Sequence, residues 1–189
     1  MAEGIGEKVK EGVIGAVRGA GDVVGAIRST VTQLLVGTLK DAGEVTSTAL
    51  GVVTDAVRGA LRGTKETGTD ATQSARAIVS GAVEAVAQVG GDVVVGAKNA
   101  VRGAIKGAAE VGRDVGVTAV GAVEGAVEAA GKVGKDVTSV ATGAAKQALD
   151  SAGEISKDAV EAVKKGLSSA ASLPRDVIRS VVKDEEEKM

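Results

Sequence analysis

Apolar side chains recur along the chain with a period of 22 residues. Four consecutive units, beginning at Gly90, Gly112, Gly134 and Ser156, each carry Asp in third place and Ile or Val in last place. The same register extends back to residue 2, so eight units cover residues 2–177. Places twelve and sixteen of the units are the most consistently apolar. We call their larger members the apolar stripe: Val13, Leu35, Leu39, Val57, Val101, Ile105, Val123 and Val127.

The period itself indicates the type of secondary structure. Twenty-two is twice eleven, and eleven residues make three turns of about 3.67 residues each, close to the turn of an α-helix. The stripe therefore falls on one helix face. The alternation of a β-strand does not fit this spacing. The sequence therefore predicts an all-α protein with long Gly/Ala/Val-rich amphipathic helices, arranged as a helical hairpin or as an oligomeric bundle or tube.

Charged residues at places 17 and 21 of the units agree with helices. These places are four residues apart, and so they are neighbours on a helix surface. Most units carry opposite charges there, which predicts ion pairs within single helices. The pairs are Arg18/Asp22, Lys40/Glu44, Arg62/Glu66, Lys106/Glu110 and Glu128/Lys132, and Asp150/Glu154 is an exception.

Glycine occupies place 14 in the first six units. A glycine inside a helix costs about 1 kcal/mol relative to alanine, so such a regular column needs a reason. A missing side chain lets a second backbone approach closely. We therefore predict that six glycines mark helix-packing contacts: Gly15, Gly37, Gly59, Gly81, Gly103 and Gly125.

The Gly-x-Asp sequences at 90–92, 112–114 and 134–136 allow two interpretations. Each glycine could end a helix of about 19 residues and each Asp could cap the next helix, which gives a solenoid of short helices. Alternatively, they lie inside a continuous helix. Because Pro174 is the only proline of the chain, the sequence favours continuity.

Composition bears on how the stripe is covered. The chain has no Phe, Tyr, Trp, His or Cys, and a core of valine and alanine buries little area per residue. Self-association or an apolar surface should therefore supply the remaining stabilisation, and we expect a homo-oligomer. The same composition predicts no catalytic residue, no metal site and no cofactor.

The net charge of −2 and the lack of aromatic residues argue against nucleic acid as a partner. No signal peptide is expected, and the longest uncharged run is too short for a membrane span. A helix lying on a bilayer is compatible with the pattern. We expect a cytoplasmic protein associated peripherally with a membrane.

Changes along the chain suggest four segments. Residues 1–66 form an N-terminal arm near the membrane, 67–72 a hinge, 73–173 a C-terminal arm, and 174–189 a docking helix with an acidic tail. Gly68 can end a helix, and Asp70 can cap the next one.

Two apolar clusters are candidates for interaction. The most lipophilic segment fits either lipid contact or the tightest part of a bundle; its lipid-proximal candidates are Ile27, Val31, Leu34 and Leu35. The short amphipathic segment after Pro174 fits either docking on a partner protein or a frayed terminus. Its candidate docking residues are Val177, Ile178, Val181 and Val182.

The repeat resembles two classes of protein. The eleven-residue periodicity, with the sequences at 7–13 and 64–68, is similar to that of synucleins, perilipins and late-embryogenesis-abundant proteins. The glycine-notched stripe with a docking-like tail also resembles the oligomeric membrane-association stalk subunits of bacterial respiratory hydrogenases. The second resemblance implies a tail that docks on an enzyme complex and an apolar interior that carries quinone.

Together these observations predict a non-catalytic scaffold. It would self-associate through the Val/Ala/Gly stripe and tether a complex at a membrane, and it would enclose a conduit for a lipophilic molecule such as quinone. The alternative is a protein that coats lipid surfaces or protects against stress.

Overall fold

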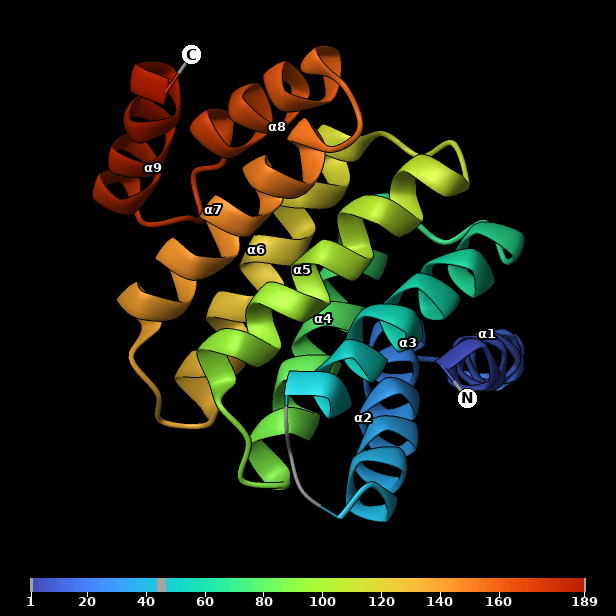
Figure 1. Cartoon of the computed structure of the whole chain (residues 1–189). Helices are drawn as coiled ribbons and strands as arrows, with labels where there is room; N and C mark the ends of the chain where they lie inside the picture. Colours follow the sequence, from blue (N-terminus) through green and yellow to red (C-terminus); the bar gives the residue numbers. More distant parts are fainter. Residues whose placement is uncertain (1, 44–46, 189) are drawn as a thin grey trace.

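The protein is built from short helices joined by tight turns. The computed structural model describes residues 2–43 and 47–188, which contain nine helices and no strand, so the all-α prediction is confirmed (Figure 1). The helices are α1 (Ala2–Gly19), α2 (Val23–Asp41), α3 (Ser47–Glu66), α4 (Ala71–Gln88), α5 (Val93–Glu110), α6 (Val115–Lys132), α7 (Val137–Gly153), α8 (Lys157–Ser169) and α9 (Arg175–Lys188).

The Gly-x-Asp sequences end and begin helices, so the expectation of a continuous helix is wrong. Gly90 has a φ of +75°, a conformation that favours glycine, and it follows the last turn of α4. The Gly91 amide donates to the Val86 carbonyl, and the Gly90 amide donates to the Ala87 carbonyl, which closes a Schellman motif. The Asp92 carboxylate then accepts hydrogen bonds from the first amides of α5. Glycine and Asp thus satisfy both helix ends without a proline.

The same turn recurs at the proposed hinge. Gly68 ends α3 with a φ of +72°, and Asp70 caps α4 by accepting from the Gln73 amide. Both sequence-predicted end signals are confirmed. The turn has the same positive-φ glycine as the turns that follow α4, α5 and α6. Each of the two expected arms is divided into several helices.

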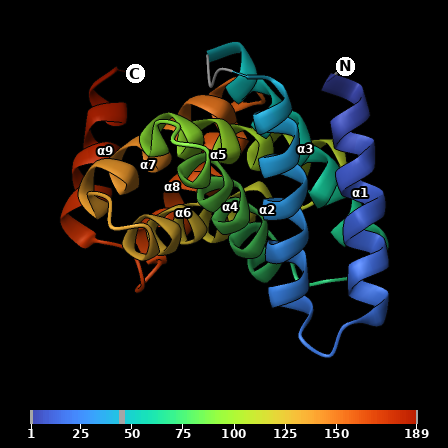
Figure 2. The same ribbon diagram turned by 90° about the horizontal axis from the view of Figure 1, so that it is seen from below.

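Each helix packs mainly on the helix two places along the chain. The contacts α1–α3–α5–α7 form one layer, α2–α4–α6–α8 form the other, and contacts between consecutive helices join the layers. Helix α9 packs on α7 and α8. The two termini therefore lie at opposite ends of the array (Figure 2). This architecture is an α-solenoid in which one 22-residue unit supplies one helix and its turn.

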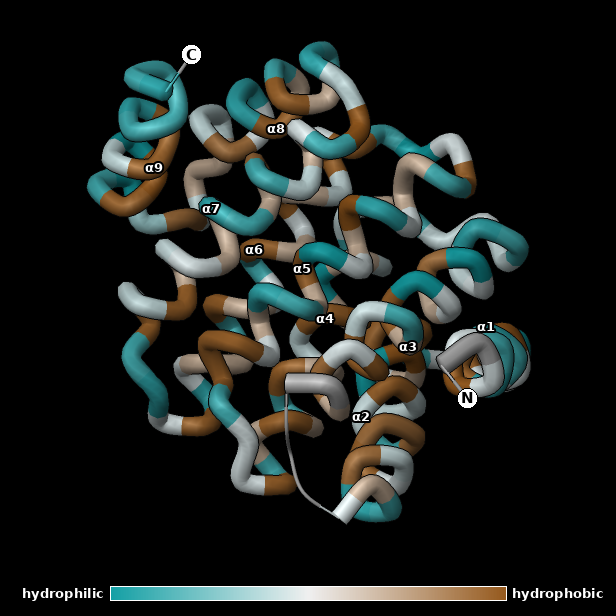
Figure 3. The backbone as a smooth tube through the Cα atoms, viewed as in Figure 1, coloured by the Kyte–Doolittle hydropathy of each residue, from teal (hydrophilic) through white to brown (hydrophobic). Residues whose placement is uncertain are grey.

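The apolar stripe is covered by the chain itself. Seven of its eight residues are at most 1% exposed, and Val127 is half-buried against the same core. In Figure 3 the hydrophobic positions alternate with polar ones along each helix, as expected for helices with one buried face. Alternate units of one chain therefore bury the stripe, and the expectation that a second copy or a lipid must cover it is wrong.

The lipophilic segment lies in the same core. Ile27, Val31 and Leu35 are fully buried, and Leu34 is half-buried. Their side chains face neighbouring helices of the solenoid, so this segment is a tightly packed part of the bundle and its buried residues have no surface for lipid.

The glycine column follows the two-place stacking rule. A Cβ on Gly81 would lie 2.6 Å from the Arg28 carbonyl oxygen, and one on Gly103 would lie 2.5 Å from that of Thr54. In the same way, Gly59 of α3 lies against the backbone of α1, and Gly125 of α6 lies against the backbone of α4. These four glycines allow close backbone contact. The carbonyl oxygens that they approach belong to residues of the helix two places earlier in the chain: Gly6, Arg28, Thr54 and Arg76.

The packing assignment does not extend to Gly15 and Gly37. A Cβ at either position would meet nothing within 4 Å. They belong to α1 and α2, and among the described helices none lies two places before either of these. The column is regular in sequence, but its contact begins only with the third unit.

Candidate functional site: a polar groove over α2, α4 and α6

A polar depression lies on the even layer. It has two adjoining parts, of about 630 and 330 Å³, that share Arg28, Glu84 and Gln88. Helix α2 supplies its outer face, and α4 and α6 supply residues of their C-terminal halves. We call this site the polar groove and define it by Arg28, Ser29, Thr32, Gln33, Val36, Gly37, Lys40, Glu84, Gln88, Lys132 and Val133.

An ion-pair network fixes one side of the polar groove. Glu128 of α6 binds Arg28 at 3.5 Å and Arg76 at 2.8 Å, and it also pairs with Lys132. Lys132 reaches Glu84 at 3.7 Å. Partial burial acts to raise the pKa of Glu128, but hydrogen bonds from Lys132 and Arg76 outweigh it and lower that pKa below its ordinary value. Glu128 therefore stays charged and holds α2, α4 and α6 together.

The other side of the polar groove carries free polar groups. Within the described residues Lys40 has no ion pair, and it lies beside the open position at Gly37. The groove lining contains three cations, Arg28, Lys40 and Lys132, against the single carboxylate of Glu84. Glu128 pairs with Arg28 and Lys132 from beside the lining, so the excess is one positive charge, that of Lys40.

Ion pairs of the same kind connect the odd layer. Glu110 of α5 pairs with Arg58 and Arg62 of α3, and Glu154 pairs with Lys106 at 2.7 Å and Arg102 at 3.5 Å. Hydrogen bonding to Lys106 lowers the pKa of Glu154. Place 17 of one unit therefore pairs with place 21 of the unit two further on.

This finding corrects the prediction of pairs within helices. Among the described residues, the predicted set contains one such ion pair, Glu128/Lys132. The partners of Arg62 and Lys106 lie 48 residues away instead. It also explains why Asp150/Glu154 lacked opposite charges, since Glu154 is neutralised by α5. The Lys40/Glu44 pair lies partly outside the described residues.

The candidate docking residues are turned towards the protein's own core. Val177, Ile178 and Val181 are at most 9% exposed and attach α9 to the end of the solenoid, while Val182 is half-buried. The segment is therefore neither frayed nor open, and its apolar side chains close the last repeats. Terminal repeats of solenoids need such a cover, with polar residues outside.

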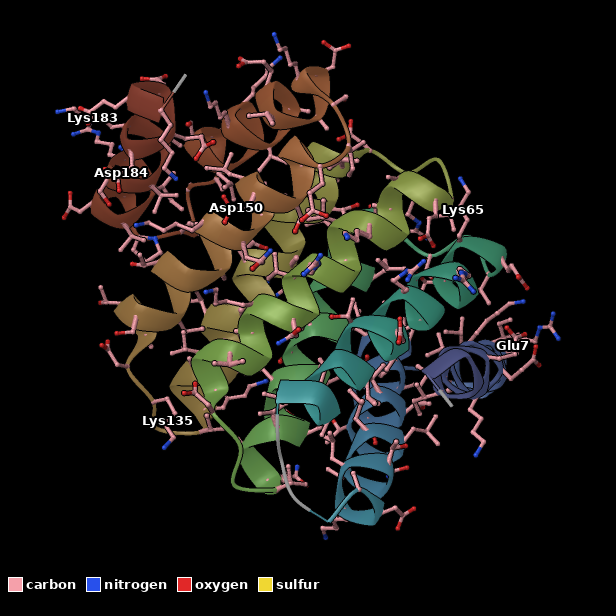
Figure 4. The ribbon with its side chains drawn as sticks, in the orientation of Figure 1. Glu7, Lys65, Lys135, Asp150, Lys183 and Asp184 are labelled. Atoms are coloured by element: carbon pink, nitrogen blue, oxygen red, sulfur yellow. The ribbon has the colours of Figure 1, made fainter. Side chains whose placement is uncertain are left out.

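The described residues were compared with the requirements of metal sites and of membrane-spanning helices. They contain no group of three or more His, Cys, Asp or Glu side chains that could hold a metal ion. None of the described helices is both long enough and apolar enough to cross a bilayer. Charged side chains such as Glu7, Lys65 and Lys135 extend from the periphery instead (Figure 4).

Comparison with known proteins supports the architecture. No protein-family model and no curated protein matches the chain. A de novo designed helical repeat protein of known crystal structure is similar over 99% of this chain and 94% of its own, with a TM-score of 0.50 and 19% sequence identity. At this identity the likeness shows the fold alone, that of a helical repeat protein.

Sequence reasoning missed the polar groove. Its residues come from three units that are not consecutive; Gln33 stands in a column without a fixed residue type, and Gln88 is the uncharged member of the charged column at place 21. One usable signal was present. Places 17 and 21 match in charge between alternate units as well as within a unit, and testing both offsets would have indicated the stacking.

Proposed function

We propose that this protein is a non-catalytic helical-repeat scaffold that holds an acidic segment of a partner protein in the polar groove. The observation that carries the proposal is the excess of cations in a groove that crosses three interlocked helices. An extended acidic segment could contact Lys40 and the amide of Gln88 without displacing the ion pairs around Glu128.

The stiffness of the solenoid favours this role. Backbone contacts at the glycine column and ion pairs between alternate helices hold the groove residues at fixed spacing. A preformed surface loses less conformational entropy when it binds than one that must first become ordered. A scaffold therefore gains affinity from the same contacts that stabilise its fold.

Charge reversal at one groove residue tests the proposal. Lys40→Glu reverses a charge within the polar groove, whereas Lys65→Glu makes the same change at the last turn of α3, away from the groove. Both variants lose the same favourable interaction with a helix C-terminus, so their stabilities should match. Cross-linking followed by mass spectrometry in extracts should recover a partner with the wild type and Lys65→Glu but not with Lys40→Glu. Recovery of every partner by Lys40→Glu would reject the groove.

Self-association, membrane tethering and carriage of a lipophilic molecule stay predictions, and each needs a surface other than the apolar stripe. Large exposed apolar side chains among the described residues are Val95, Val117 and Ile155, which belong to three different segments. An apolar pocket of about 490 Å³ that includes Ile5 and Leu39 is the place to seek a lipophilic ligand. Light scattering and co-sedimentation with vesicles measure the first two directly.

A further inference from the structure

The C-terminal end of the solenoid contains a second depression, unrelated to the polar groove. It lies between α8 and α9 and has a volume of about 340 Å³, within the range of small-molecule sites. Its floor is apolar and is formed by Leu167, Leu173, Ile178 and Val182. We call it the C-terminal cleft. Both helices are visible at the end of the array opposite α1 in Figure 1.

Cations line one edge of the C-terminal cleft. Arg175, Arg179 and Lys183 follow at intervals of four residues, so they stand in one row on α9 and repel one another. Within the described residues neither arginine forms an ion pair, and Lys183 has only Glu187 at 4.0 Å. By contrast, Arg28, Arg62 and Arg76 each pair with a carboxylate of another helix. The side chains of Arg175 and Arg179 are exposed to solvent, so an anion would take the place of water as their partner.

The charge order of α9 strengthens this edge. Helix N-termini carry partial positive charge, and the first two turns of α9 add Arg175 and Arg179 against one acidic residue, Asp176, while the acidic run Asp184 to Glu187 lies near the C-terminus. The helix dipole and the two arginines thus add up to a positive potential at one end of the cleft. Glu186 also lines the cleft, and it lies about 16 Å from Arg175 along the helix axis, counted at 1.5 Å per residue.

These features together specify an amphiphile with a negative head. A carboxylate would accept hydrogen bonds from the two guanidinium groups, and a short aliphatic chain would lie on the four apolar side chains and point towards Glu186. The geometry points to the C-terminal cleft as a binding site for a single-chain carboxylate amphiphile of medium length. This inference does not rest on the proposed function, because cleft and groove share no residue.

Calorimetric titration of the full chain with sodium decanoate, below its micelle concentration, tests the inference. Saturable binding with one site is expected. Arg175→Gln/Arg179→Gln should weaken it at least tenfold, because charge-assisted hydrogen bonds are lost. The matched control Lys65→Gln/Lys135→Gln removes two exposed cations elsewhere and should bind as the wild type does. Val182→Glu, which puts a carboxylate on the floor, should also abolish binding. Circular dichroism verifies that each variant remains folded.

Three comparisons exclude other occupants. Decanol has the same chain without the charge, and binding equal to decanoate would overturn the role of the arginines. Vesicles of phosphatidylcholine and phosphatidylglycerol present anionic headgroups at a surface; binding to them without binding of decanoate would overturn the small-molecule site. A glutamate-rich peptide that binds while decanoate does not would also overturn it. Equal weakening in the arginine and lysine variants would show a non-specific charge effect and reject the inference.

Discussion

Two glycine-to-alanine substitutions should change stability in opposite directions. Gly37 and Gly103 occupy the same place of the repeat, and both lie inside helices. Alanine at Gly37 meets nothing within 4 Å, so it should stabilise the protein by about 1 kcal/mol through helix propensity alone. Alanine at Gly103 has the same propensity gain, but its Cβ would lie 2.5 Å from the Thr54 carbonyl oxygen.

The structure gives the size of the conflict. Ordinary van der Waals contact begins near 3.4 Å, so α3 and α5 would have to separate by about 0.9 Å, the difference from 2.5 Å. Such a shift would stretch the hydrogen bond of 3.0 Å from the Thr54 hydroxyl to the Asn99 carbonyl, and the Arg62–Glu110 pair of 3.4 Å. Overpacking of this kind typically costs about 1–3 kcal/mol.

The difference between the two variants isolates the packing term, because the propensity gain is common to both. We expect Gly103→Ala to be less stable than Gly37→Ala by about 2 kcal/mol, which corresponds to about 4–8 °C in Tm at this chain length. Thermal and urea unfolding, followed by far-ultraviolet circular dichroism, measures this difference. If Gly103→Ala were as stable as Gly37→Ala, the close approach of α3 and α5 would be refuted.

Three further predictions concern a turn, a carboxylate and the end of the array. Gly90→Ala forces a side chain into a positive φ and should cost about 1–2 kcal/mol in urea unfolding, whereas Gly131→Ala, which meets nothing within 4 Å, should not destabilise. Because the folded state lowers the pKa of Glu128 below its ordinary 4.5, its stabilising effect should be complete above that pH and lost as pH falls through the lower, folded-state value. Glu128→Gln should thus be less stable than the wild type at neutral pH, and the two unfolding curves should converge in acid; a gap that persists there would contradict the pairing. Ile178→Ala removes a side chain that is 5% exposed and should cost about 2 kcal/mol, with Ser180→Ala on the exposed face of α9 as the control.

The helical class and the buried face followed from the sequence because both depend on a local period. The spacing of Val101 and Ile105 marks one helix face wherever the partner of that face lies. What covers the face depends on chain topology, and a 22-residue period is the same for stacking within a chain as between chains. The decisive detail was the turn, since Gly112 with Asp114 can be recognised as the end of one helix and the cap of the next.

The candidate sites were harder to predict, for a related reason. The polar groove joins Arg28, Glu84 and Lys132, whose separation in sequence carries no motif. The docking residues were correctly recognised as one apolar face, but a single helix face does not indicate whether its partner is another protein or the preceding repeat. In this chain Val177 and Val181 contact the end of the same solenoid.

The open positions at Gly15 and Gly37 have a consequence for how such an array could be lengthened. Duplicating 44 residues copies one member of each layer together with its glycine contact and its charged partners, so no existing interface has to be redesigned. Gly15 and Gly37 leave open backbone surface on α1 and α2, against which an added pair of helices could pack. Evolution or protein engineering could therefore extend the array at its N-terminal end in steps of two units, while α9 keeps the opposite end closed.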